Sequence, residues 1–229
     1  VLYTLSTLWN LLMNPPMNPN IEIWNHIALI KDDAYFTKWV KEAGKLAHHD
    51  GFLDYLRPYL HGTMIDCGAN IGTHAYGYAK FGKVICFEPN PIAFECLTHN
   101  MAGTNSELYN AAVSNVNGFI DLVDCGTNYG AVYTKPGWSI PTVVIDDFKF
   151  TDITFMKIDV EGDEIAALLG AAQTIRTYKP VMCIESNPET LSRKGHTVND
   201  LLDLLSELGY TTEVRTPLDI SSDILCKPR

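Results

Sequence analysis

The sequence predicts an α/β fold with a mostly parallel seven-stranded sheet, helices on both faces, and an N-terminal helical extension. Three observations predict it. From residue 62 onward, short apolar strands alternate with helical patterns, which indicates a parallel sheet covered on both sides. A glycine-rich loop follows the first apolar strand. Residues 1–61 show no strand pattern, so we assign 1–61 to the extension and 62–229 to the main domain.

The extension is expected to contain helical pieces with aromatic faces. Residues 1–13 are apolar but short and lack a basic region, which favours a docked amphipathic helix over a signal peptide. The segments YFTKWVKEAGKLAHH and FLDYLRPYL predict two further helices. Trp24, Tyr35, Phe36 and Trp39 are concentrated here. We expect most of them to pack on the main domain and a minority to form a wall or lid of an acceptor site.

The main domain has five strands of the parallel type and two extra strands. The parallel strands are expected at Met64–Cys67, Val84–Phe87, around Leu108–Ala112, Ile153–Val160 and Val181–Ser186, and the extra ones at Phe119–Cys125 and Pro141–Phe148. TTEV and DILCKP predict a closing antiparallel pair. Helix boundaries are predicted by Asn90 with Pro91, by Asp163 with Glu164, by Thr197 with Asp200, and by Gly209.

Composition limits the classes of partner. The chain has 229 residues, a net charge of −10 and a pI near 5.0. This charge argues against nucleic acid and against an anionic membrane surface, because both require clustered lysine and arginine. The six cysteines show no C-x-x-C spacing, which favours core residues in a reducing, cytoplasmic environment. We expect a small-molecule or glycan partner, and a homodimer stays open.

The glycine-rich loop predicts a nucleotide-like ligand. Asp66 ends the first strand, and Gly68, Asn70 and Gly72 then occupy every second position. These residues tolerate positive φ and let a ligand approach the backbone. A helix opening at Thr73 would direct N–H groups at an anion.

The spacing favours S-adenosylmethionine over a dinucleotide. Glu88 ends the second strand twenty positions after Gly68, where its oxygens can accept hydrogen bonds from ribose hydroxyls. The dinucleotide fingerprint would require a third glycine where Thr73 stands, so a dehydrogenase is disfavoured.

A second constellation predicts acid–base chemistry. Lys157, Asp159 and Glu161 alternate along the strand that should end at the ligand edge of the sheet, where buried charge is costly unless it is paired or used. Glu161 is the first candidate for a general base, Asp159 the second, and His74 the third, because a helix N-terminus would keep its imidazole neutral. Glu185 could join a metal site, but Lys157 competes for the carboxylates, and we predict no metal.

These motifs resemble the FkbM-type methyltransferases. The resemblance is carried by KIDVEGDEIAALLGA, VIDDF, KPVMCIE, IDCGANIGTHAY and FEPNP, over about Thr63 to Glu185. It implies a Rossmann-like class I fold and transfer of a methyl group from S-adenosylmethionine to an oxygen of a carbohydrate or natural product. Alternatives are N- or C-methylation of a small molecule and a non-catalytic S-adenosylmethionine-binding protein.

The resemblance also implies roles for individual residues. Glu88 would hold the ribose, residues near Asn110–Ala112 would flank the adenine, and Asp66 and Asp159 would lie near the methionine moiety. The full set expected to bind the cofactor is Asp66, Gly68, Ala69, Asn70, Gly72, Thr73, Glu88, Pro89, Asn90, Asn110, Ala111, Ala112 and Asp159.

Overall fold

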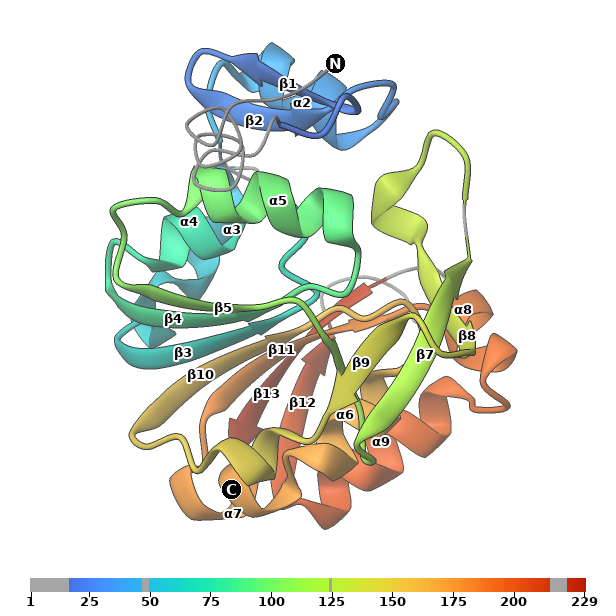
Figure 1. Ribbon diagram of the computed structural model, residues 1–229. Helices are drawn as coiled ribbons and strands as arrows, with labels where there is room; N and C mark the ends of the chain where they lie inside the picture. Colours follow the sequence, from blue (N-terminus) through green and yellow to red (C-terminus); the bar gives the residue numbers. More distant parts are fainter. Residues whose placement is uncertain (1–16, 47–49, 124, 215–221) are drawn as a thin grey trace.

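The computed structural model describes residues 17–46, 50–123, 125–214 and 222–229. Its centre is a seven-stranded sheet in the order β12-β13-β11-β10-β3-β4-β5 (Figure 1). The strands are β3 (Gly62–Cys67), β4 (Gly82–Phe87), β5 (Ser106–Tyr109), β10 (Ile153–Ile158), β11 (Val181–Ser186), β12 (Tyr210–Val214) and β13 (Ser222–Pro228). Strand β13 pairs antiparallel with both of its neighbours, β11 and β12, and the other pairings in this sheet are parallel. The predicted seven-stranded, mostly parallel sheet is confirmed, and so is its closing antiparallel pair.

The strand order places a switch point between β3 and β10. The chain leaves β3 towards β4 and β5, and then returns to pair β10 with the other side of β3. Connections diverge to opposite faces at such a point, which opens a crevice beyond the carboxyl ends of the strands. Lys157 and Asp66 face each other in this register, and both are almost fully buried. They are exceptions in otherwise apolar central strands.

Helices cover both faces of the sheet, as predicted (Figure 1). One face packs against α3 (Asp50–Leu56), α4 (Ala75–Tyr78) and α5 (Pro91–Asn100). The other packs against α6 (Glu164–Gly170), α7 (Ala172–Tyr178) and α9 (Val198–Glu207), and α8 (Pro188–Arg193) follows β11. The two apolar clusters hold the strand ends in fixed register.

The N-terminal part contains a hairpin that the sequence analysis did not predict. Strands β1 (Ile21–Trp24) and β2 (Ile27–Ile30) pair antiparallel across a two-residue turn. Asn25 and His26 both have positive φ, 47° and 67°, which matches the twist of a hairpin. The expectation that this part has no strands was therefore wrong. The expected helices are present as α2 (Phe36–Ala43) and α3, whereas the helix predicted for residues 1–13 lies outside the described residues.

The third and the extra strands differ from the prediction. The segment predicted around Leu108–Ala112 is divided between β5 and β6 (Ala112–Val113), which belong to different sheets. Strand β6 joins β9 (Ile140–Val143), β7 (Gly118–Val123) and β8 (Tyr133–Pro136) in a second sheet. The end of the predicted strand Pro141–Phe148 is a 3-10 turn, Ile145–Phe148. This sheet carries the loop before β8 towards the N-terminal part.

Local signals in the sequence are confirmed. The Asn90 side chain accepts a hydrogen bond from the Ile92 backbone N–H at the start of α5, and Thr197 and Asp200 form a capping box at α9. Gly209 follows α9 with φ of 89°. Five of the six cysteines are buried core residues. No helix among the described residues is long and apolar enough to cross a membrane.

Candidate active site

A cavity of about 880 Å³ opens at the switch point. It lies in the size range of small-molecule sites. The loops after β3, β4 and β10 line it, together with Glu185 near the end of β11, α2 and the residues before it, and residues 128–132 before β8. The predicted ligand edge of the sheet is therefore hollow, and the N-terminal part contributes to its wall.

The loop after β3 brings bare backbone to the cavity. Gly68 has φ of 85°, and a Cβ at this position would lie 1.8 Å from the backbone oxygen of Asp159. Asn70 and Gly72 also have positive φ, 50° and 95°. No side chain can be placed at Gly68 without moving the backbone that follows β10. The alternating glycines thus allow the loop to pass closely over the neighbouring strand.

Glu88 fastens this loop to the end of β4. Its two oxygens accept hydrogen bonds from the backbone N–H groups of Asn70, at 2.7 Å, and Asn90, at 2.8 Å. The carboxyl group is buried, and burial raises the pKa of Glu88 to about 7, although the two N–H donors oppose this shift. Glu88 still lines the cavity, and each carboxylate oxygen has further acceptor capacity.

Most of the residues expected at the cofactor line this cavity. They are Gly68, Ala69, Asn70, Thr73, Glu88, Pro89, Asn90, Ala111, Ala112 and Asp159. Asp66, Gly72 and Asn110 are not among the lining residues. The Asn110 amide instead donates to the backbone oxygen of Glu88 at 2.7 Å, so it fixes the strand tip. Asp66 is buried beneath the loop, and burial raises the pKa of its carboxyl group to about 7.

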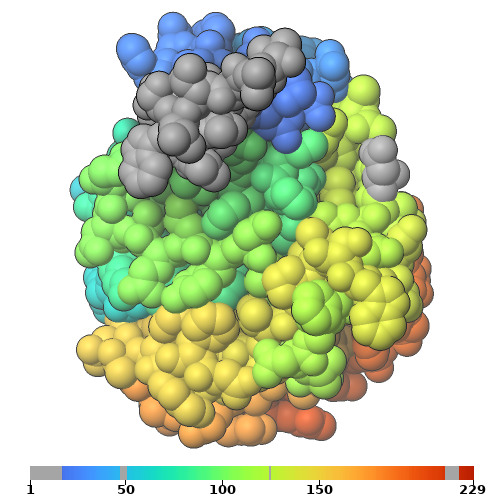
Figure 2. All heavy atoms as spheres, viewed as in Figure 1, coloured from blue at the N-terminus to red at the C-terminus, as the bar shows by residue number. Residues whose placement is uncertain are grey.

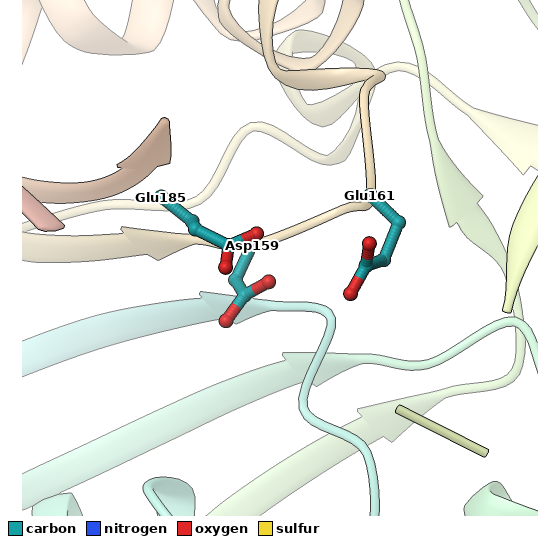
Figure 3. Close-up of side chains that lie close together, drawn as sticks. All are labelled: Asp159, Glu161 and Glu185. Atoms are coloured by element: carbon teal, nitrogen blue, oxygen red, sulfur yellow. The ribbon is translucent and has the colours of Figure 1, made fainter. Parts of the chain in front are cut away.

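Three carboxylates converge at the ends of β10 and β11. Asp159, Glu161 and Glu185 each place an oxygen within 4.8 Å of the others. Figure 3 shows Asp159 and Glu161 on the segment that follows β10 and Glu185 on β11, with their carboxylates turned towards one another. All three are half-buried and line the cavity. The structure thus places Glu185 beside Asp159 and Glu161, the two acids that the sequence predicted as candidate bases.

Lys157 is the buried cation of this site. Its Nζ lies 2.9 Å from Oδ2 of Asp159 and 3.8 Å from Oδ1 of Asp223, and its side chain is 2% exposed. Burial opposes the ammonium charge, but Asp159 and Asp223 outweigh it and raise the pKa of Lys157 well above its usual value. Lys157 therefore stays charged and keeps Asp159 in one position.

Glu161 has a different environment from Asp159. It has φ of 54°, outside the strand geometry that the sequence analysis assumed for it. Burial, together with the charges of Asp159 and Glu164, raises the pKa of Glu161 to about 8. The segment is held from below by Glu164, whose Oε1 accepts hydrogen bonds from the backbone N–H groups of Val160 and Gly162. A carboxylate with this pKa can take up a proton near neutral pH.

His74 lines the cavity at the position before α4. Its ring lies 5.1 Å from that of Phe52 and 6.0 Å from that of Tyr78, measured between centroids. Helix α4 has only four residues, so the predicted effect of a positive helix end is small here. The contacts support packing as one role of His74.

The carboxylate cluster also has the donor set of a divalent cation. Asp159, Glu161 and Glu185 offer oxygen ligands of the kind that magnesium or calcium takes. Lys157 already contacts Asp159 and supplies a positive charge at the same group. The expectation of a metal-free site remains a prediction.

The N-terminal aromatic residues contribute more to the wall than the expected minority, because Tyr35, Phe36 and Trp39 all line the cavity. Two lining residues were not expected at all: Asp223 on β13, which pairs in register with Glu185, and Tyr129. The Gly/Asn-rich composition of residues 126–130 was the available signal for the last of these.

The sheet order, the switch-point cavity and the glycine loop with Glu88 define a class I S-adenosylmethionine-dependent methyltransferase. The family model of the methyltransferase FkbM domain matches residues 66–212, so the chain belongs to the FkbM methyltransferase family. The resemblance drawn from the motifs is confirmed, as are the enzyme class and the cofactor.

Individual relatives agree with this assignment. The hexuronic acid methyltransferase AglP of Haloferax volcanii is 30% identical over 175 residues, which cover 71% of this chain and 69% of that protein. The crystal structure of methyltransferase FkbM from Methylobacillus flagellatus KT is 25% identical, with a TM-score of 0.51. That match covers 72% of this chain but 43% of that protein. An rRNA methylase from Streptococcus thermophilus shares the fold alone, at 12% identity and a TM-score of 0.50 over 78% of this chain and 94% of that one.

Proposed function

We propose that this enzyme transfers a methyl group to an oxygen atom of a carbohydrate, with a carboxylate of the cavity as general base. The observation that carries the proposal is the convergence of Asp159, Glu161 and Glu185 in the same cavity as the glycine loop. A relative 30% identical is named for hexuronic acid, a sugar that carries both hydroxyl and carboxylate oxygens. This supports a sugar as the acceptor.

The residues of the cavity fit the donor. Space for a nucleoside comes from the bare backbone at Gly68 and the small side chains of Ala111 and Ala112. Glu88 supplies oxygens that can accept hydrogen bonds from it. Asp66, beneath the loop and outside the cavity lining, has a buried Oδ2 with no hydrogen-bond partner among the described residues. When bound, S-adenosylmethionine supplies an electrophilic methyl group. The chain holds the donor and the acceptor in line, and positioning of this kind contributes up to roughly 7–11 kcal/mol in ideal cases.

Glu161 is the proposed base. Its pKa of about 8 means that a fraction of the enzyme carries the free carboxylate near neutral pH, while the protonated form remains stable enough to hold the proton taken from the acceptor hydroxyl. Asp159 is fixed by Lys157 and is better suited to orient the acceptor by hydrogen bonding. The proton then leaves Glu161 for solvent through the open side of the cavity.

The proposal is tested with a panel of acceptors. Purified enzyme and S-adenosylmethionine are incubated with the methyl glycosides of glucuronic acid, galacturonic acid and glucose, with a polyphenol and with a primary amine. Mass spectrometry then identifies the methylated product. Methyl transfer to a glycoside is expected. Methylation of the amine alone, or of a carbon atom, would replace the proposal by the alternative of N- or C-methylation.

The linkage formed in a glycoside product tests the base. An ether resists mild alkali, whereas a methyl ester of the uronic acid releases methanol. An alcohol must lose a proton during the reaction, but a carboxylate acceptor is already ionised at neutral pH. An ester product would keep the carbohydrate acceptor and remove the need for Glu161 as base.

A further inference from the structure

We propose that Tyr35 and Trp39 form an aromatic platform that binds the apolar face of the acceptor's pyranose ring. This inference rests on the proposed carbohydrate acceptor and adds the part of the cavity that would recognise it. Both side chains line the cavity that holds the carboxylate cluster. They belong to the N-terminal part, outside the residues that the family model matches.

The two side chains share one face of α2. Tyr35 is the residue that precedes the helix, and Trp39 follows four residues later, so the two lie one turn apart on the same side. The Trp39 backbone N–H donates to the Tyr35 carbonyl oxygen at 2.9 Å. Tyr35 is 58% exposed and Trp39 is 42% exposed, although large aromatic side chains are normally buried. Both side chains therefore keep surface that a ligand in the cavity can contact.

Contacts around the start of α2 hold this face in place. Asp33 is buried and accepts hydrogen bonds from the backbone N–H groups of Tyr35 and Phe36. The Phe36 ring packs so closely on Gly130 that a Cβ at that glycine would lie 2.2 Å from it. The Ala34 N–H donates to the Thr127 carbonyl oxygen at 2.9 Å. Figure 2 shows the N-terminal part in blue meeting the yellow-green segment that leads to β8.

The N-terminal part is in turn anchored to α5. Asn100 is buried at the end of α5. Its Oδ1 accepts a hydrogen bond from the Ala28 N–H at 2.7 Å, and its Nδ2 donates to the carbonyl oxygens of Ala28 and Ile71. An apolar cluster of the hairpin, α2, α5 and Ile71 surrounds these bonds. Such contacts suit a fixed wall better than a lid, because opening it would expose the amide bonds and the apolar cluster together.

The chemistry of the wall matches a sugar. A pyranose ring presents C–H groups on its faces and hydroxyls around its rim, and a flat aromatic surface pairs with the former. Lys38 and Glu42, on the same helix, line the cavity beside the aromatic pair and can bond the rim. The carboxylates lie on the sheet side of the same cavity. A ring stacked on α2 would therefore lie in the same cavity as the carboxylates, with its rim hydroxyls free to bond polar groups of the wall.

The test measures acceptor binding separately from donor binding. Variants Trp39→Ala, Trp39→Phe and Tyr35→Ala are compared with Trp138→Ala, which removes a tryptophan that is 87% exposed and does not line the cavity. Titration calorimetry with the methyl glycoside of glucuronic acid is done on enzyme saturated with S-adenosylhomocysteine, and donor affinity is measured alone. We expect about tenfold weaker glycoside binding in Trp39→Ala, a smaller loss in Trp39→Phe, and no change in donor affinity.

Each outcome distinguishes the two proposals. Glycoside binding and methylation that are equal in Trp39→Ala and the wild type would overturn the platform and leave the proposed function standing. A wild-type enzyme that methylates the polyphenol but binds no glycoside would overturn both. An equal loss of donor and glycoside affinity in Trp39→Ala, with Trp39→Phe behaving in the same way, would show that Trp39 supports the fold and is not the platform.

Discussion

Replacement of Glu161 by glutamine should make the protein more stable at alkaline pH. The pKa of the carboxyl group is raised from its ordinary 4.5 to about 8 in the folded protein, chiefly by burial. The unfolded chain therefore loses this proton at lower pH than the folded chain does. Between about pH 4.5 and pH 8 the folded state binds more protons, so stability falls as pH rises.

The magnitude follows from the size of the shift. A change from 4.5 to about 8 corresponds to at most about 5 kcal/mol of lost stability above pH 8. Glu161 lines an open cavity and is only half-buried, so solvent screening reduces this to roughly 1–3 kcal/mol. Glutamine has the same shape and no charge. We expect the variant to exceed the wild type by that amount near pH 8.5 and to match it near pH 4.5.

Urea denaturation across this pH range measures the difference directly. Glu207→Gln serves as the matched control, because Glu207 is exposed on α9 and does not line the cavity. Asp66, Glu88 and Glu164 have pKa values raised to about 7, but they are present in both proteins and largely cancel. If the free energy of unfolding of Glu161→Gln and of the wild type changes with pH in the same way, the pKa of the Glu161 carboxyl group is not raised by burial and the reasoning is refuted.

The same variant tests the base. If Glu161 takes the acceptor proton, wild-type turnover should rise with pH up to about 8, and Glu161→Gln should lose roughly 10²- to 10⁴-fold in kcat with little change in donor affinity. A flat pH profile together with an active variant would contradict the mechanism.

Three other measurements address the rest of the site. Glu88→Ala should weaken S-adenosylmethionine binding, measured by calorimetry, by at least about tenfold. Glu88→Gln should weaken it less, because glutamine keeps one acceptor oxygen. Equal affinities in Glu88→Ala and the wild type would exclude Glu88 from the donor site. Lys157→Met should lower the free energy of unfolding, measured in urea, by about 1–3 kcal/mol, because Asp159 and Asp223 lose the cation that they share. The loss is limited because both acids are about one-third exposed to water. An unchanged free energy of unfolding would show that the ion pairs contribute nothing to stability. Dialysis against EDTA should leave turnover unchanged, because Lys157 already neutralises Asp159; recovery only after magnesium is added would make the carboxylates metal ligands.

The sequence predicts the parts of the fold whose signals are local. The strands β3, β4 and β11 are mostly apolar and are followed by a glycine loop or by a helix that begins with proline, and their positions are confirmed. The hairpin β1–β2 was missed because its strands have four residues each and its turn, Asn25-His26, has no glycine. The second sheet was missed because β6 and β9 are paired by the tertiary fold across nearly thirty residues of chain.

The candidate site also has a part that the sequence predicts and a part that depends on tertiary packing. The sequence places Glu88, Asp159 and Glu161 at strand ends, and the topology of a parallel sheet brings such ends together. It does not fix side-chain direction. Asn110 stands at a strand tip as expected, yet its amide turns to the backbone of Glu88. Tyr35 and Phe36 are adjacent aromatic residues that both line the cavity, and only tertiary packing places the Phe36 ring against Gly130.

The segment after β10 contains several features that destabilise the folded state. Glu161 has a left-handed backbone that costs a non-glycine residue about 1–3 kcal/mol, and its carboxyl group is desolvated beside another acid. Gly162 follows with φ of 109° and packs against the backbone oxygen of Thr190, where a Cβ would clash. Glu164 holds this conformation by bonding Val160 and Gly162 from below. A strained and desolvated acid supported in this way is consistent with the proposed role of Glu161 in proton transfer, because a purely structural turn with this backbone conformation favours glycine or asparagine.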